Sequence, residues 1–188
     1  SKTENSLSDR ISTFIEENIS MINEAVILVF IEGEIDSNLL SKTIEKYVTS
    51  LEKSFIVYRA NRYNIKGKEY LKSLEKYYVA DIGLRNFMLG KKSMDVGYIL
   101  ENIIYLELIR RGYSVYVGKI DDMEIDFVAQ NSQGNTYIQV AASVRDENTL
   151  KRELRSLQVV KDNYPKMILT LDDDPESDYD GILRKNAL

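Results

Sequence analysis

The sequence contains no cysteine and no histidine among its 188 residues. These absences exclude disulfides, zinc sites of the usual kind, thiol nucleophiles, and Ser-His or Cys-His catalysis. The catalytic groups that remain are carboxylates, lysine, tyrosine, serine and an oxygen-ligated metal ion such as Mg²⁺. A cysteine-free composition suits a cytoplasmic protein, so we expect that location.

Long apolar runs and a nucleotide-binding loop are also missing. Residues 25–31 form an apolar run that is far shorter than the roughly 18 residues of a membrane helix, and no signal peptide precedes it. We therefore expect no membrane partner. Gly67, Gly90 and Gly118 each precede a lysine but lack the earlier glycine of a Walker A motif. ATP would therefore act only through a nucleotide-binding domain absent from this chain.

Positive charge is concentrated in one part of an acidic chain. The net charge is -5, yet residues 39–92 hold 12 Lys and Arg against 5 Asp and Glu. This segment begins with an expected amphipathic helix over 39–55 and continues into an expected basic hairpin over 59–68. A local basic segment predicts an anionic partner such as DNA, although basic residues also simply coat exposed helix faces. The candidate nucleic-acid-binding residues are Lys42, Lys46, Arg59, Arg62, Lys66 and Lys68.

The rest of the chain is organised around residues 97–142. An apolar helix over 97–108 ends at Arg110-Arg111-Gly112, where cations and then glycine favour a helix C-terminus. Three strand-like runs follow, at 114–119, 123–130 and 137–142, and then a helix over 148–162 and a strand over 166–171. Residues 131–134 are typical of a hairpin turn. Such a turn pairs Gln130 with Asn135 and sets Asp126 opposite Gln139, with Glu101 available from the helix.

This pattern resembles the core of the PD-(D/E)XK nuclease superfamily, which runs helix, three strands, helix, strand. That core carries a helix Glu, a strand Asp and then Glu-x-Lys on the next strand. Here the two acids match at Glu101 and Asp126, whereas the third element is Gln139-Val140-Ala141. The resemblance implies an α+β fold with an αβββαβ domain.

The resemblance also implies a metal site whose catalytic residues are Glu101, Asp126 and Gln139. Glu101 and Asp126 would bind Mg²⁺, the Val140 carbonyl could add a third oxygen, and Gln139 offers only a neutral one. Ala141 replaces the lysine, and losing one such electrostatic contact slows a reaction by roughly 10²- to 10³-fold. We therefore expect a degenerate site, unless a cation reaches in from a neighbouring element, the candidates being Lys119, Arg145 and Lys151. In the plainer alternative, both acids are ordinary structural carboxylates.

Several further segments look like the C-terminal region of prokaryotic AAA-type ATPases, in which a winged helix precedes a nuclease-like domain of unassigned function. They span residues 75–86, 100–108, 124–129, 137–141 and 161–166. By this resemblance, residues 1–72 form a winged-helix-like domain, with 39–55 as its recognition helix and 59–68 as its wing. Residues 73–188 form the nuclease-like domain. The apolar run at 25–31 departs from the polar helix that this pattern has there.

Three functions follow from these observations. The first is a catalytically degenerate nuclease-fold module that binds DNA or docks partners for an AAA-type ATPase domain in the same or a partner chain. The second is an active Mg²⁺-dependent DNA endonuclease. The third is a protein-interaction or homo-oligomerisation module without a nucleic-acid role.

Overall fold

The computed structural model describes residues 34–35, 42–89 and 95–188. These residues form one mixed sheet and four helices, so the protein is an α+β protein. The helices are α2 (Lys42–Lys53), α3 (Ile82–Leu89), α4 (Val96–Arg110) and α5 (Glu147–Gln158). The strands are β1 (Glu34–Ile35), β2 (Val57–Asn64), β3 (Glu69–Val79), β4 (Ser114–Ile120), β5 (Met123–Asn131), β6 (Gly134–Val140), β7 (Lys166–Thr170), β8 (Ser177–Tyr179) and β9 (Ile182–Asn186).

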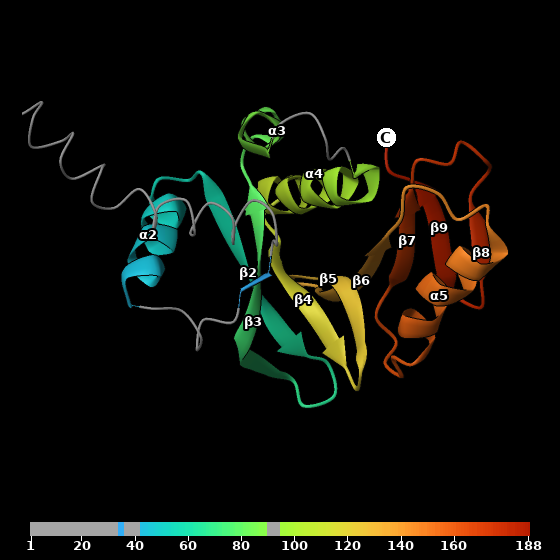
Figure 1. Cartoon of the computed structure of the whole chain (residues 1–188). Helices are drawn as coiled ribbons and strands as arrows, with labels where there is room; N and C mark the ends of the chain where they lie inside the picture. The colour runs from blue at the N-terminus through green and yellow to red at the C-terminus, as the bar shows by residue number, and fades with distance from the viewer. Residues whose placement is uncertain (1–33, 36–41, 90–94) are drawn as a thin grey trace, which may run out of the picture.

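The nine strands follow the order β1-β3-β2-β4-β5-β6-β7-β9-β8. Strands β4, β5 and β6 pair antiparallel in sequence order, and β7 then joins β6 in parallel after the crossover through α5. The hairpin of β2 and β3 joins the same sheet because β2 pairs in parallel with β4. Figure 1 shows α2 beside β2 and β3 at one end of the sheet, and α5 beside the C-terminal strands at the other.

The β5–β6 hairpin has the predicted register. Gln130 lies opposite Asn135, and Asn131 lies opposite Gly134. The regular pairing stops at Phe127 and Ile138, so Asp126 lies directly beyond the last paired residues. This end of the ladder is the part of the sheet that matters for function.

Helices α4 and α5 cover opposite faces of the central strands. In β5, Phe127 and Ala129 belong to a buried cluster with Leu100 and Ile104 of α4. Val128, between them in sequence, belongs to a second cluster, which also contains Leu154 and Leu157 of α5. Neighbouring side chains of a strand point to opposite faces, so Phe127 and Val128 are buried on different faces of the sheet.

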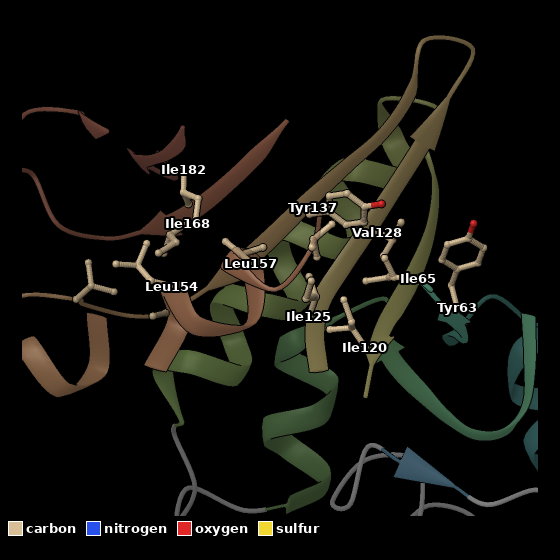
Figure 2. Close-up of a cluster of buried hydrophobic side chains, with 13 residues drawn as sticks. Tyr63, Ile65, Ile120, Ile125, Val128, Tyr137, Leu154, Leu157, Ile168 and Ile182 are labelled. Atoms are coloured by element: carbon tan, nitrogen blue, oxygen red, sulfur yellow. The ribbon is translucent and has the colours of Figure 1, made fainter. Parts of the chain in front are cut away.

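The second cluster contains side chains from strands β2, β4, β5, β6, β7 and β9 (Figure 2). It reaches from Tyr63 in β2 to Ile182 in β9 and includes Ile65, Ile120 and Tyr137. The proposed domain boundary between residues 72 and 73 falls inside β3 of this continuous sheet. The predicted hairpin over 59–68 is therefore part of the main sheet.

Other elements differ from the sequence-based expectations in detail. Helix α5 ends at Gln158, before the predicted residue 162, and strand β8 was not predicted. Asp172 is buried and accepts a hydrogen bond from the Val144 amide at 2.8 Å. The apolar run over 25–31 lies outside the described residues. In the described part of the chain, no helix is long and apolar enough to cross a membrane.

Candidate functional site

Glu101 is brought to the sheet by the way α4 is attached to β3. Asp95 caps the helix by accepting hydrogen bonds from the amides of Gly97 and Tyr98. Asn102, the residue after Glu101, has a buried side chain that accepts a hydrogen bond from the Val79 amide at 2.8 Å and donates one to the Val79 carbonyl at 2.9 Å. This double hydrogen bond fixes the helix against β3 and sets the position of Glu101.

Two side chains of β3 hold the Glu101 carboxylate. The Tyr78 hydroxyl donates to Oε1 at 2.6 Å, and Lys76 Nζ lies 2.7 Å from the same oxygen. Lys76 and Tyr78 share a face of β3 because they are two residues apart. Burial, and then Glu101, raise the pKa of Tyr78 well above its usual value. Tyr78 therefore stays protonated and remains a donor.

Lys76 is the central cation of this site. Its side chain is 13% exposed, and Nζ also lies 3.8 Å from Glu124 Oε1. Burial alone would lower the pKa of Lys76, but Glu101, Asp126 and Glu124 raise it above its usual value. The lysine therefore stays charged among three carboxylates.

Asp126 lies where the ladder between β5 and β6 ends, and side-chain hydrogen bonds replace the ladder there. The Val140 amide donates to Asp126 Oδ2 at 2.8 Å, while the Asp126 amide donates to Gln139 Oε1 at 2.7 Å. Gln139 Nε2 then donates to Glu153 of α5 at 3.0 Å. Gln139 therefore links the end of the sheet to α5, because its side-chain oxygen and nitrogen are both hydrogen-bonded.

The environment of Asp126 disfavours its negative charge. Burial raises the pKa of Asp126 to about 8, and the Glu101 carboxylate adds to the rise. The Lys76 ammonium and the Val140 amide oppose it without cancelling it. A cation that binds beside Asp126 would restore the charged form. We call Lys76, Tyr78, Glu101, Glu124 and Asp126 the acid–lysine cluster.

An open cleft of about 440 Å³ leads to Asp126 from the side of α5. Its lining includes Glu124, Asp126 and Gln139 from the sheet, and Arg152 and Arg155 from α5. Acidic groups at the base and arginines on the helix suit a ligand that carries both phosphate groups and a bound metal ion.

The structure links the predicted site residues Glu101, Asp126 and Gln139. Both acids raise the pKa of Lys76, and Gln139 accepts a hydrogen bond from the Asp126 amide. Ala141 packs in the hydrophobic cluster on the α5 face. Arg145 and Lys151, which we considered as substitute cations, pair instead with Asp174 and Glu147, at 2.8 and 2.7 Å. The cation that does reach the acids is one that the sequence analysis did not select.

The predicted nucleic-acid-binding residues do not form one group. Lys42 and Lys46 are exposed on α2, and Lys68 is exposed in the β2–β3 turn. Arg59 pairs with Glu52 and Glu75, and the buried Arg62 pairs with Glu124. Lys66 is 60% exposed and pairs with Asp121 at 2.6 Å. The two arginines therefore serve ion pairs within the protein.

Sequence reasoning missed Lys76, Tyr78 and Glu153. A signal for the first two exists in β3, where Lys76 and Tyr78 alternate with Glu75 and Tyr77. Tyr77 faces a cluster with α2, whereas Tyr78 faces α4. Period two therefore indicates that Lys76 faces α4 once β3 is placed beside that helix. Glu153 follows Arg152 on α5, and its pattern resembles an ordinary surface ion pair.

Comparison with known proteins gives a family model and two relatives. Residues 20–95 match a family model described as a domain of unknown function (DUF8612). An uncharacterized protein of Haemophilus influenzae is 46% identical over 140 residues, which are 74% of this chain and 34% of that protein. The uncharacterized protein MJ1544 of Methanocaldococcus jannaschii is 29% identical over 150 residues, which are 75% of this chain and 33% of that protein. The chain thus spans about a third of the length of these curated relatives, and no solved structure matches it.

Proposed function

We propose that the acid–lysine cluster is a divalent-cation-dependent phosphodiesterase site that acts on DNA. The observation that carries the proposal is the position of Lys76, whose Nζ lies 2.7 Å from Glu101 and whose pKa is raised by both Glu101 and Asp126. It supplies the positive charge that Ala141 cannot supply. The αβββαβ order of α4, β4, β5, β6, α5 and β7 supports the nuclease-like part of the proposal.

Each side chain of the cluster has a distinct role in this proposal. Lys76 neutralises the charge that develops on the phosphate, and Tyr78 orients Glu101 through its hydrogen bond. Glu101 holds Lys76 in place and keeps it charged. Arg152 and Arg155 line the cleft above Asp126 and meet neighbouring phosphates of the strand.

The residues present fit a divalent cation, although they form no complete cage. No group of three or more acidic side chains among the described residues is arranged as a metal cluster. Two acids and the Val140 carbonyl could hold the ion together with water. Burial, and then the Glu101 carboxylate, raise the pKa of Asp126, and a bound cation would lower it again. Mg²⁺ bound there would stabilise charge on the phosphate and activate water.

The larger assembly is part of the same proposal. We propose that the chain works beside an AAA-type ATPase domain, as the resemblance implies. The lengths of the relatives support this proposal, because about two thirds of each relative lies outside the segment that matches this chain. DNA would then be delivered to the site by the ATPase domain.

A binding-only module is the second candidate, and one observation favours it. Gln139 carries no charge, and both ends of its amide are occupied by Asp126 and Glu153. Lys76 already neutralises Glu101 by direct pairing. A site of this kind could bind DNA or a partner without cutting.

Cleavage of supercoiled and linear DNA with Mg²⁺ or Mn²⁺ tests the proposal. We expect nicking by the wild type, and a roughly 10²- to 10³-fold slower reaction for Lys76→Gln, because one electrostatic contact to the transition state is lost. Glu101→Gln combined with Asp126→Asn should abolish nicking. Lys161→Gln is the matched control, since it makes the same change at an exposed lysine outside the cluster and outside the candidate nucleic-acid-binding residues.

The other outcomes separate the candidates. DNA binding that weakens steeply with salt, without any cleavage, would favour the binding-only module. Equal nicking by the wild type and the double variant would reject the proposed site. A protein that neither binds nor cuts DNA would leave the protein-interaction module.

A further inference from the structure

Arg85 of α3 is a buried cation with two unpaired guanidinium nitrogens. The residue is 4% exposed, and its Nε and Nη1 atoms are buried and make no hydrogen bond. The guanidinium stacks on the Tyr98 ring, with Cζ at 4.1 Å from the ring centroid. The Tyr98 hydroxyl is likewise buried and unpaired. In the described part of the chain, these three atoms are the only buried side-chain nitrogen or oxygen atoms without a hydrogen-bond partner.

An unpaired buried guanidinium is costly. Stacking on an aromatic ring offsets only part of the lost hydration, and it leaves the in-plane N–H groups unsatisfied. Buried polar groups are nearly always hydrogen-bonded, so such a cluster indicates a missing partner. Guanidinium N–H groups and a phenol hydroxyl side by side are donors that match an oxyanion.

The cluster lies next to the proposed catalytic site. Tyr98 and Glu101 are on the same helix, three residues apart, so they share one side of α4. Burial raises the pKa of Tyr98, while Arg85 opposes the rise and Glu101 adds to it. The Lys76 ammonium also lowers the pKa of the Tyr98 hydroxyl. One helical turn therefore separates the unpaired donors from the acid–lysine cluster.

We propose that Arg85 Nε and Nη1, together with the Tyr98 hydroxyl, bind a phosphate group beside the acid–lysine cluster. This inference rests on the proposed function for the identity of the ligand as a phosphodiester. The ligand reaches the buried donors when α3 shifts. Two apolar side chains of this helix, Leu84 and Phe87, are 39% and 82% exposed.

Binding measured without cleavage tests this inference. The probes are inorganic phosphate and a labelled single-stranded oligonucleotide, both in EDTA, with the variants Arg85→Met, Arg85→Lys and Tyr98→Phe. We expect Arg85→Met to weaken binding by about 10- to 100-fold, since charge-assisted hydrogen bonds are lost, and Tyr98→Phe by about 3- to 10-fold. Arg110→Met is the matched control, because Arg110 is 71% exposed and lies at the end of α4; its affinity should stay within about twofold.

Stability separates a ligand site from a structural role. A ligand site predicts that Arg85→Met leaves the urea midpoint of the free protein unchanged or raises it, because an unpaired charge is removed. Phosphate should raise the midpoint of the wild type and leave that of Arg85→Met unchanged. If only the oligonucleotide depends on Arg85, the ligand is a nucleic-acid backbone. If inorganic phosphate also depends on it, a free phosphate group suffices.

Two results would overturn the inference. One is equal affinity of the wild type and Arg85→Met for both probes. The other is a lower midpoint for Arg85→Met in a protein whose midpoint responds to neither probe. Failure of the proposed function is distinguishable, because Arg85-dependent binding in EDTA requires no cleavage and should persist in Lys76→Gln.

Discussion

At the scale of single residues, charge compensation explains the candidate site. Lys76 is surrounded by carboxylates, of which Glu101 is the closest at 2.7 Å. The two acids predicted from the sequence therefore function as parts of a network. Burial, and then the Glu101 carboxylate, raise the pKa of Asp126 to about 8.

The raised pKa of Asp126 predicts how stability depends on pH. The folded protein keeps a proton on Asp126 that the unfolded chain releases, so the stability due to this proton is present at low pH. It is lost as the pH rises from 3.8 to about 8. Between about pH 5 and pH 8.5 the wild type should lose roughly 2–5 kcal/mol more unfolding free energy than Asp126→Asn, which cannot ionise.

Urea unfolding at both pH values measures this difference. Asp122→Asn is the control, since Asp122 is an exposed turn residue in the same β4–β5 connection. Parallel pH profiles for the wild type and Asp126→Asn would show that Asp126 is ionised normally. Added Mg²⁺ should reduce the wild-type pH dependence, because a bound cation favours the charged carboxylate.

At the scale of elements, one buried amide determines where α4 meets β3. Asn102 is 0% exposed and bonds the Val79 amide and carbonyl together. Asn102→Ala leaves both backbone groups buried and unpaired, so we expect about 2–5 kcal/mol lower unfolding free energy. The same variant should also slow any cleavage, because the Asn102 hydrogen bonds set the position of the preceding residue, Glu101.

Urea unfolding at neutral pH checks the expected loss. Ile103→Ala provides a comparison on the same helix, where the side chain is 50% exposed. Equal losses for the two variants would mean that Asn102 does not anchor α4.

The β5–β6 hairpin depends on a single glycine. Gly134 has a φ of 118°, and a Cβ there would lie 2.4 Å from Cε1 of the Tyr164 ring. Gly134→Ala combines backbone strain with a steric clash, so we expect about 1–3 kcal/mol lower unfolding free energy. Thermal or urea unfolding measures the effect, with Ser132→Ala in the same turn as the control. A Gly134→Ala protein as stable as the wild type would contradict the clash.

At the scale of the whole molecule, the sheet joins segments that the sequence resemblance separates. Strand β2 pairs with β4, and the cluster of Figure 2 contains side chains from both sides of residue 72. Strand β3, which carries Lys76, lies two strands away from β4. The candidate site therefore needs both parts of the chain.

A fragment of residues 73–188 tests this interdependence. It lacks β2 and the beginning of β3, so β4 loses its neighbour and the cluster around Ile120 opens to solvent. We expect the fragment to lack a cooperative unfolding transition, which circular dichroism and urea titration would measure against the full chain. A fragment that unfolds cooperatively at a similar midpoint would establish an independent domain.

The sequence alone determined the local features of this protein. Alternation and turn residues gave the β5–β6 register, and helical spacing with terminal charges gave α4, because both depend on neighbours close in the chain. The resemblance to the PD-(D/E)XK nuclease core then predicted Glu101, Asp126 and Gln139 as site residues. Tertiary structure decided which cation joins them, since Lys76 meets Glu101 only after a hairpin and a helix are packed together. It also decided that Arg59 and Arg62 pair with acids distant in sequence, because long-range contacts leave no periodic signal in the chain.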